Sequence, residues 1–261
     1  MSSIGPIINI ATDAIVLCIA AYALTKQPKV AFYYFMIIAL LVAIAGSAIY
    51  LATMNSNPRL AYGASTIAYY ISNWVFILGI AYLIRLWVKS VEWQLEERHV
   101  RSVRLVTILN YIISTVCTAG LVAITVLNVL SIIQPNVFTP LLIALTWIIV
   151  AVLITQCAVM GYLYYKESKG LDLTKKKQLY RLMLFALLQA VSSLLYAIAL
   201  FVPGVASAGY IVAFLWLALL LWPNALDGFE KDSGSAPAQP RSDIPLSGGQ
   251  RLGAKPRNPF E

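Results

Sequence analysis

The chain has 261 residues, of which 60% are hydrophobic and only 11% are charged, whereas an ordinary soluble domain carries about 25% charged residues. A soluble domain of this length cannot bury so much apolar surface, because surface-to-volume scaling limits burial. The sequence therefore excludes a soluble globular protein and predicts an all-α, polytopic membrane protein. The net charge of +8 would also suit a nucleic-acid partner, but the positions of the charges favour the membrane and no nucleic acid is expected.

The first three spans are predicted from long uncharged stretches. About 20 apolar residues cross a hydrocarbon core of about 30 Å as a helix. Stretches of this kind predict helices over about 6–25, 30–52 and 63–88. Asn55, Asn57 and Pro58 are typical turn residues and separate the second helix from the third.

The later spans follow from two breaks in longer apolar stretches. Residues 105–165 carry no charge, and as one helix they would extend about 90 Å, so the chain must fold back. Gln134-Pro135-Asn136 divides them into helices over about 104–133 and 139–165. Pro203-Gly204 similarly separates helices over about 181–202 and 205–226. The expected total is seven helices, followed by a Pro-, Gly- and Ser-rich cytosolic tail over 231–261 that is expected to be disordered.

The basic residues are concentrated in every second connection between the predicted spans. Of the 19 Lys and Arg residues, 18 fall on one predicted side of the membrane and only Arg59 falls on the other. Because basic residues prefer the cytosolic side, this distribution predicts an N-terminus outside and a C-terminus in the cytosol. Residues 89–104 are expected to form a helical extension beyond the bilayer or a short interfacial helix.

Asp13 is the clearest candidate for a functional residue, because an ionisable side chain inside a membrane is a functional hypothesis by default. It could bind a proton, a cation or a ligand amine, or it could form a hydrogen bond that packs helices together. Asn73 and the sixth-helix residues Gln189, Ser192 and Ser193 are further candidates for a ligand site. Residues spaced by three and four share one helix face, although such polar groups also serve helix packing.

Lys175, Lys176, Lys177 and Arg181 form the densest basic cluster. They are candidates for contacts with anionic lipid headgroups, although the preference of basic residues for the cytosolic side explains them equally well. Cys18, Cys117 and Cys157 lie in apolar stretches without metal-ligand spacing, so neither a disulfide framework nor a metal site is expected. No cofactor motif is present, and no cofactor is expected.

The third span reads Tyr70-Ile71-Ser72-Asn73-Trp74-Val75-Phe76, which resembles the Arg-Tyr-Ala-Asp-Trp-x-Phe stretch of microbial rhodopsins over a segment of about 45 residues. Asn73 stands where that family has its proton-accepting aspartate. The stretch from Gly204 to Leu226 contains no lysine, so a retinal Schiff base cannot form and a light-driven pump is excluded. In overall build the chain is similar to uncharacterised seven-helix membrane proteins of fungi.

These features lead to three hypotheses for a protein of the plasma membrane or an internal membrane. The first is a non-enzymatic protein that binds or transports a small lipophilic or weakly cationic molecule, with the lipid bilayer as its surroundings. The second is a receptor or interaction protein that signals through its basic cytosolic loops. The third is an enzyme similar to membrane-embedded terpene cyclases. Paired carboxylates would suit that chemistry, but Asp227 is predicted at the far end of the bundle from Asp13, which disfavours an enzyme.

Overall fold

The computed structural model describes residues 4–26, 31–92 and 95–202, and this part of the chain is all-helical. Its six helices are α1 (Ile4–Lys26), α2 (Phe32–Thr53), α3 (Pro58–Val91), α4 (Glu97–Val129), α5 (Pro135–Glu167) and α6 (Leu173–Ala199). Each is long and apolar enough to cross a membrane. By length and composition of its helices, the chain is therefore an integral, multi-pass membrane protein. The predicted seventh helix and the predicted tail lie outside the described residues.

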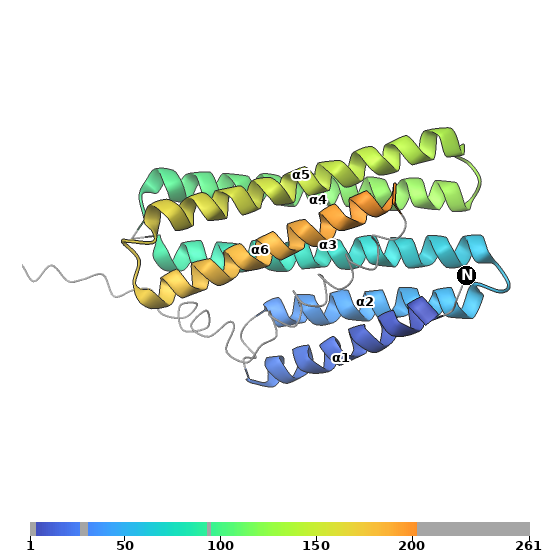
Figure 1. The fold of residues 1–261 in the computed structure, drawn as a ribbon, viewed down its shortest axis with the longest axis horizontal. Coiled ribbons are helices and arrows are strands. Elements are labelled where there is room, and N and C mark those ends of the chain that lie inside the picture. The colour runs from blue at the N-terminus through green and yellow to red at the C-terminus, as the bar shows by residue number, and fades with distance from the viewer. Residues whose placement is uncertain (1–3, 27–30, 93–94, 203–261) are drawn as a thin grey trace, which may run out of the picture.

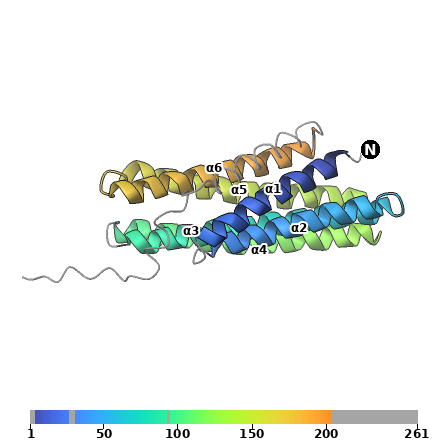
Figure 2. The ribbon, with the colours of Figure 1, turned by 90° about the horizontal axis from the view of Figure 1, so that it is seen from below.

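The helices run up and down in chain order (Figure 1). Each helix packs against the next one along the chain. In addition, α6 contacts α3. Helix α3 therefore lies at the centre, between α2, α4 and α6. Figure 2 shows the same bundle from below, with α1 crossing over α2. Among the described helices, α1 approaches only α2.

The connections that carry the basic residues lie together at one end of the bundle. The α1–α2, α3–α4 and α5–α6 connections share this end, and the α2–α3 and α4–α5 connections lie at the other (Figure 1). We call the first the basic end and the second the opposite end. At the opposite end, the Arg59 guanidinium donates a hydrogen bond to the Ser131 hydroxyl and so connects the beginning of α3 to the turn that follows α4.

At the basic end, helices α3 to α6 extend beyond the spans expected from hydropathy, because charged residues continue them. At the opposite end, α4 and α6 stop before the expected ends at about 133 and 202. Helix α4 begins at Glu97 instead of about 104, and α6 begins at Leu173 instead of about 181. Asp172 caps α6 by accepting a hydrogen bond from the backbone N–H of Lys175 at 2.8 Å. Asn57 caps α3 in the same way through the N–H of Leu60 at 3.1 Å. Side-chain caps of this kind satisfy backbone donors that a helix start leaves unpaired.

Two clusters of buried apolar residues form the core. The larger one draws residues from all six described helices towards the basic end, and Trp87, which is fully buried, is its largest side chain. The smaller one joins α3, α4, α5 and α6. Outside the core, many large apolar side chains remain exposed, including Ile108, Val116 and Ile154. Exposed apolar surface of this extent matches a surrounding of lipid, which is as apolar as these side chains.

Candidate functional site

Asp13 lies in α1 and is buried, with only 7% of its surface exposed. It lies nine residues after the first residue of the helix, which is about 13 Å along the axis, and so close to the middle of this 23-residue helix. Its Oδ2 atom has no hydrogen-bond partner among the residues that the structure describes. A buried carboxylate oxygen without a donor is costly in an apolar surrounding, so this atom is suited to bind a group that the described helices do not supply.

Asn73 and Gln189 form a direct contact between α3 and α6. The Gln189 side-chain amide donates a hydrogen bond to Asn73 Oδ1 at 2.6 Å, and Gln189 is buried. Ser193, one turn further along α6, lines the same small cavity as Asn73. The structure therefore brings together Asn73, Gln189 and Ser193, which come from two helices far apart in the sequence. Ser192 is half-buried beside them and does not line this cavity.

Tyrosine rings continue this polar contact towards the opposite end. The rings of Tyr69 and Tyr196 stack with centroids 4.4 Å apart, and the hydroxyls of Tyr70 and Tyr196 share a hydrogen bond. We call these residues together with Asn73, Gln189 and Ser193 the polar seam between α3 and α6. Because spacings of three and four residues place side chains on one helix face, the sequence predicts that the α6 candidates share a face. Asn73 of α3 is also a candidate from the sequence, but the contact between the two helices could not be predicted from it.

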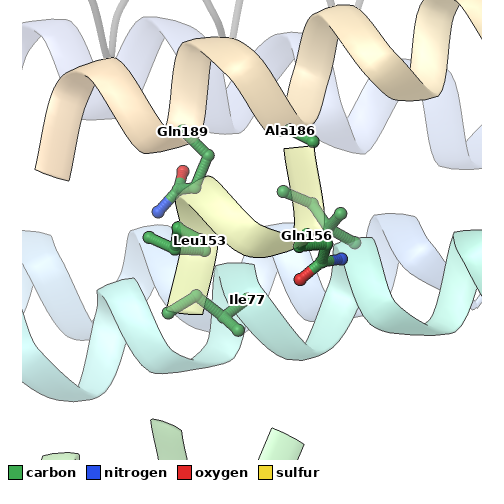
Figure 3. A pocket seen from close by; sticks show the side chains of 6 residues that line it. Ile77, Leu153, Gln156, Ala186 and Gln189 are labelled. Carbon is green, nitrogen blue, oxygen red and sulfur yellow. The ribbon is translucent and has the colours of Figure 1, made fainter. Parts of the chain in front are cut away.

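A second pair of amides lies beside the seam, between α4 and α5. Asn110 donates a hydrogen bond from Nδ2 to Gln156 Oε1 at 3.0 Å, and both side chains are buried. In Figure 3, Gln156 and Gln189 project from α5 and α6 into the space that Leu153 and Ile77 also line. Gln156 Nε2 has no hydrogen-bond partner among the described residues. Asn110 and Gln156 are not among the site residues predicted from the sequence, although an amide within a charge-free span is itself a signal.

The seam is closely packed in this conformation. The cavity bounded by Asn73, Thr146, Ser193 and the tyrosines measures about 20 Å³, which is enough for one water molecule but not for an organic ligand. The space between Gln156 and Gln189 has no room for a water molecule. The seam thus joins helices in the form described here, as interhelical hydrogen bonds of membrane proteins commonly do.

Asp13 is separate from the seam. Helix α1 does not bring any Cα atom within 8 Å of α3 or α6, whereas the seam belongs to those two helices. The described structure therefore presents two distinct polar features, a buried carboxylate on α1 and an amide-containing seam at the centre of the bundle. The sequence candidates do not converge on one cavity within the described residues.

The basic cluster at the start of α6 divides into inward and outward members. Lys175 is buried, and its Nζ donates a hydrogen bond to Ser90 Oγ at 3.0 Å. Its backbone carbonyl accepts a hydrogen bond from Trp87 Nε1 at 3.3 Å. Lys177 is exposed, and Lys176 and Arg181 are half-buried. Lys175 therefore joins α6 to α3, and Lys177 is the member of the cluster that faces outward most clearly.

Within the ranges that the structure describes, no three His, Cys, Asp or Glu side chains are grouped so that they could hold a metal ion. Comparison of the chain with protein-family models, with curated proteins and with solved structures found no match.

Proposed function

We propose that this chain is a non-enzymatic membrane protein that binds or transports a small lipophilic, weakly cationic molecule, with Asp13 as the residue that recognises the positive charge. The observation that carries this proposal is the buried Oδ2 atom of Asp13, which no donor in the described residues satisfies. A carboxylate removed from water is stabilised by a proton or by a cation beside it. An ammonium group on an apolar molecule supplies both the charge and the apolar body that suit a position within a span.

The distribution of the other acidic residues favours binding over acid–base catalysis. Within the described part of the chain, the remaining acidic side chains are in the α3–α4 and α5–α6 regions at the basic end, at positions 92, 96, 97, 167 and 172. No second carboxylate among them lies beside Asp13, and general acid–base chemistry with two carboxylates needs both at one reacting group.

The experiment compares the wild type with Asp13→Asn and with Thr12→Val, all purified in lipid discs. Asp13→Asn keeps the size of the side chain, removes its charge and replaces one acceptor oxygen with an N–H donor. Thr12→Val changes a neighbouring polar residue of α1 and serves as the matched control. Mass spectrometry of retained small molecules, followed by titration with dodecylammonium as a lipophilic amine cation, measures binding.

We expect Asp13→Asn to weaken binding of the cation at least tenfold, since an interaction with a charged group contributes about 1.5–3 kcal/mol. Thr12→Val should bind as the wild type does. Equal binding by the wild type and Asp13→Asn would refute the role of Asp13. If binding is present, uptake of the cation into vesicles containing the protein distinguishes transport from binding alone.

An interaction protein is the second candidate, and the exposed charges at the basic end favour it. The Arg98 and Arg101 side chains are 74% and 81% exposed, and Lys177 is exposed in the first turns of α6. A partner that binds the wild type and is lost on neutralising Arg101 and Lys177, while Asp13→Asn leaves its binding unchanged, would support this candidate over the first.

A further inference from the structure

A hollow lies between α4 and α5 near the basic end, away from α1 and outside the polar seam. Its volume is about 470 Å³, within the range of about 300–1,000 Å³ that is usual for ligand pockets. Helix α4 contributes residues 98, 99, 102 and 103, and helix α5 contributes residues 155, 158, 159, 162 and 163. We call it the α4–α5 groove.

The groove is polar at one end and apolar at the other. Arg98, His99 and Ser102 lie in the first turns of α4, at the basic end, and Tyr162 faces them from the last turns of α5. Because α5 runs in the opposite direction, Thr155 lies deepest, about 12 Å from the level of Leu163 along the helix axis. The deeper walls are formed mainly by small and aliphatic side chains. A phospholipid has the same change from polar to apolar along its length, with a charged phosphate at the membrane surface and acyl chains below it.

The charges at the mouth of the groove favour an anionic headgroup. The Arg98 guanidinium pairs with Glu96, and both side chains are more than half exposed. An exposed pair of this kind contributes at most about 1 kcal/mol, so a phosphate can replace Glu96 at little cost. His99 Nδ1 lies 2.6 Å from Glu167 Oε1, and it is His99, not Glu167, that lines the groove. The negative charge of Glu167 is therefore held behind the imidazole.

The sides of the groove identify a lipid as the occupant rather than a soluble anion. Leu105, Ile108 and Ile154 are exposed on the outer faces of the same two helices, and these helices span the membrane by length and composition. The apolar end of the groove thus lies along the surface that lipid tails cover. A small soluble anion would leave this end empty.

We propose that the α4–α5 groove binds one anionic phospholipid of the adjoining leaflet, with its phosphate at Arg98 and Ser102 and an acyl chain along Val103 and Val159. The groove is a different site from the basic cluster on α6, because its cation comes from α4. It does not depend on Asp13, so the failure of one proposal leaves the other standing.

The test uses the full chain in lipid discs that contain equal amounts of phosphatidylcholine and phosphatidylglycerol, with native mass spectrometry to count and identify the retained lipids. Arg98→Gln removes the cation at the groove. Arg101→Gln is the matched control, because it removes an equally exposed arginine of the same helix, one that pairs with Glu97 and does not line the groove. Ala158→Trp fills the groove without changing any charge, at a position that is exposed. Thermal unfolding of each variant confirms that it is folded.

We expect the wild type to retain one phosphatidylglycerol in preference to phosphatidylcholine. Arg98→Gln should reduce this preference about fivefold, the factor carried by one cation near an anionic membrane surface. Arg101→Gln should leave it unchanged, and Ala158→Trp should abolish retention of the lipid. Equal loss in Arg98→Gln and Arg101→Gln, equal retention of both lipids, or full retention by Ala158→Trp would each overturn the proposal. Binding of inorganic phosphate without a retained lipid would overturn it as well.

Discussion

The hydrogen bond between Asn73 and Gln189 should couple α3 to α6 energetically, and a double-mutant cycle can measure this coupling. The donor–acceptor distance is 2.6 Å, and Gln189 is only 4% exposed. Asn73→Leu and Gln189→Met keep the approximate size of each side chain and remove its amide. Each single substitution leaves one amide of the pair without its partner in an apolar surrounding, which costs about 1–3 kcal/mol.

The double substitution removes both amides and leaves neither unpaired. It should therefore cost less than the sum of the two single substitutions by the coupling free energy. Measured interhelical hydrogen bonds in a membrane protein average about 0.6 kcal/mol and reach about 1.7 kcal/mol. The short distance and the burial of this pair place our expectation at about 1 kcal/mol, which is about a fivefold change in the unfolding equilibrium constant.

Reversible unfolding in mixed micelles, followed by helical circular dichroism, gives the free energies of unfolding. As a control, Asn73→Leu is combined with Thr155→Val. Thr155 is exposed on α5, and its hydroxyl donates a hydrogen bond to the Ala151 carbonyl of its own helix, so these two substitutions should be additive within about 0.5 kcal/mol. A coupling between Asn73 and Gln189 no larger than that of the control pair would refute the assignment of a stabilising role to this hydrogen bond.

Two predictions concern packing in the core. A Cβ atom at Gly46 of α2 would overlap the Ala68 side chain of α3, so Gly46→Ala should destabilise the bundle by about 1–3 kcal/mol. Gly161→Ala should not destabilise it, because nothing lies within 4 Å of the added Cβ. Equal thermal unfolding temperatures for the two variants would contradict this prediction. Trp87→Ala should cost about 3–5 kcal/mol because the side chain is fully buried, while Trp147→Ala, at a position that is 39% exposed, should cost clearly less in the same unfolding measurement.

Hydropathy located the membrane-spanning cores of the six described helices but not their ends. The expected helix starts at about 104 and 181 are the positions after which charged residues no longer occur, whereas the helices begin at 97 and 173. A helix does not need to end where the bilayer ends, and capping residues such as Asp172 start it in water. Gln134-Pro135-Asn136 predicts a break between two helices, but Pro135 is itself the first residue of α5, where a proline needs no backbone hydrogen bond.

The partners of the candidate residues could be predicted only in part. The spacing of Gln189, Ser192 and Ser193 predicts that they share one face of α6. That this face meets Asn73 and Tyr70 of α3 depends on the long-range packing of α6 on α3, and periodicity within one helix carries no information about that contact. The same limit applies to Lys175. Its charge suggested a position at the lipid headgroups, whereas its Nζ reaches Ser90 of α3.

Helix α3 connects two polar contacts with α6 as one rigid element. It holds α6 at two levels, through Asn73 near its middle and through Trp87 near the basic end. The separation of 14 residues between these positions spans about 21 Å of continuous helix, and this stretch contains no proline that would interrupt the helix's hydrogen bonds. A change that separates Asn73 from Gln189 must therefore either pivot α6 about the Trp87 contact or break that contact too. A rearrangement at the Asn73–Gln189 contact is therefore expected to change the position of the start of α6, next to the connection between α5 and α6.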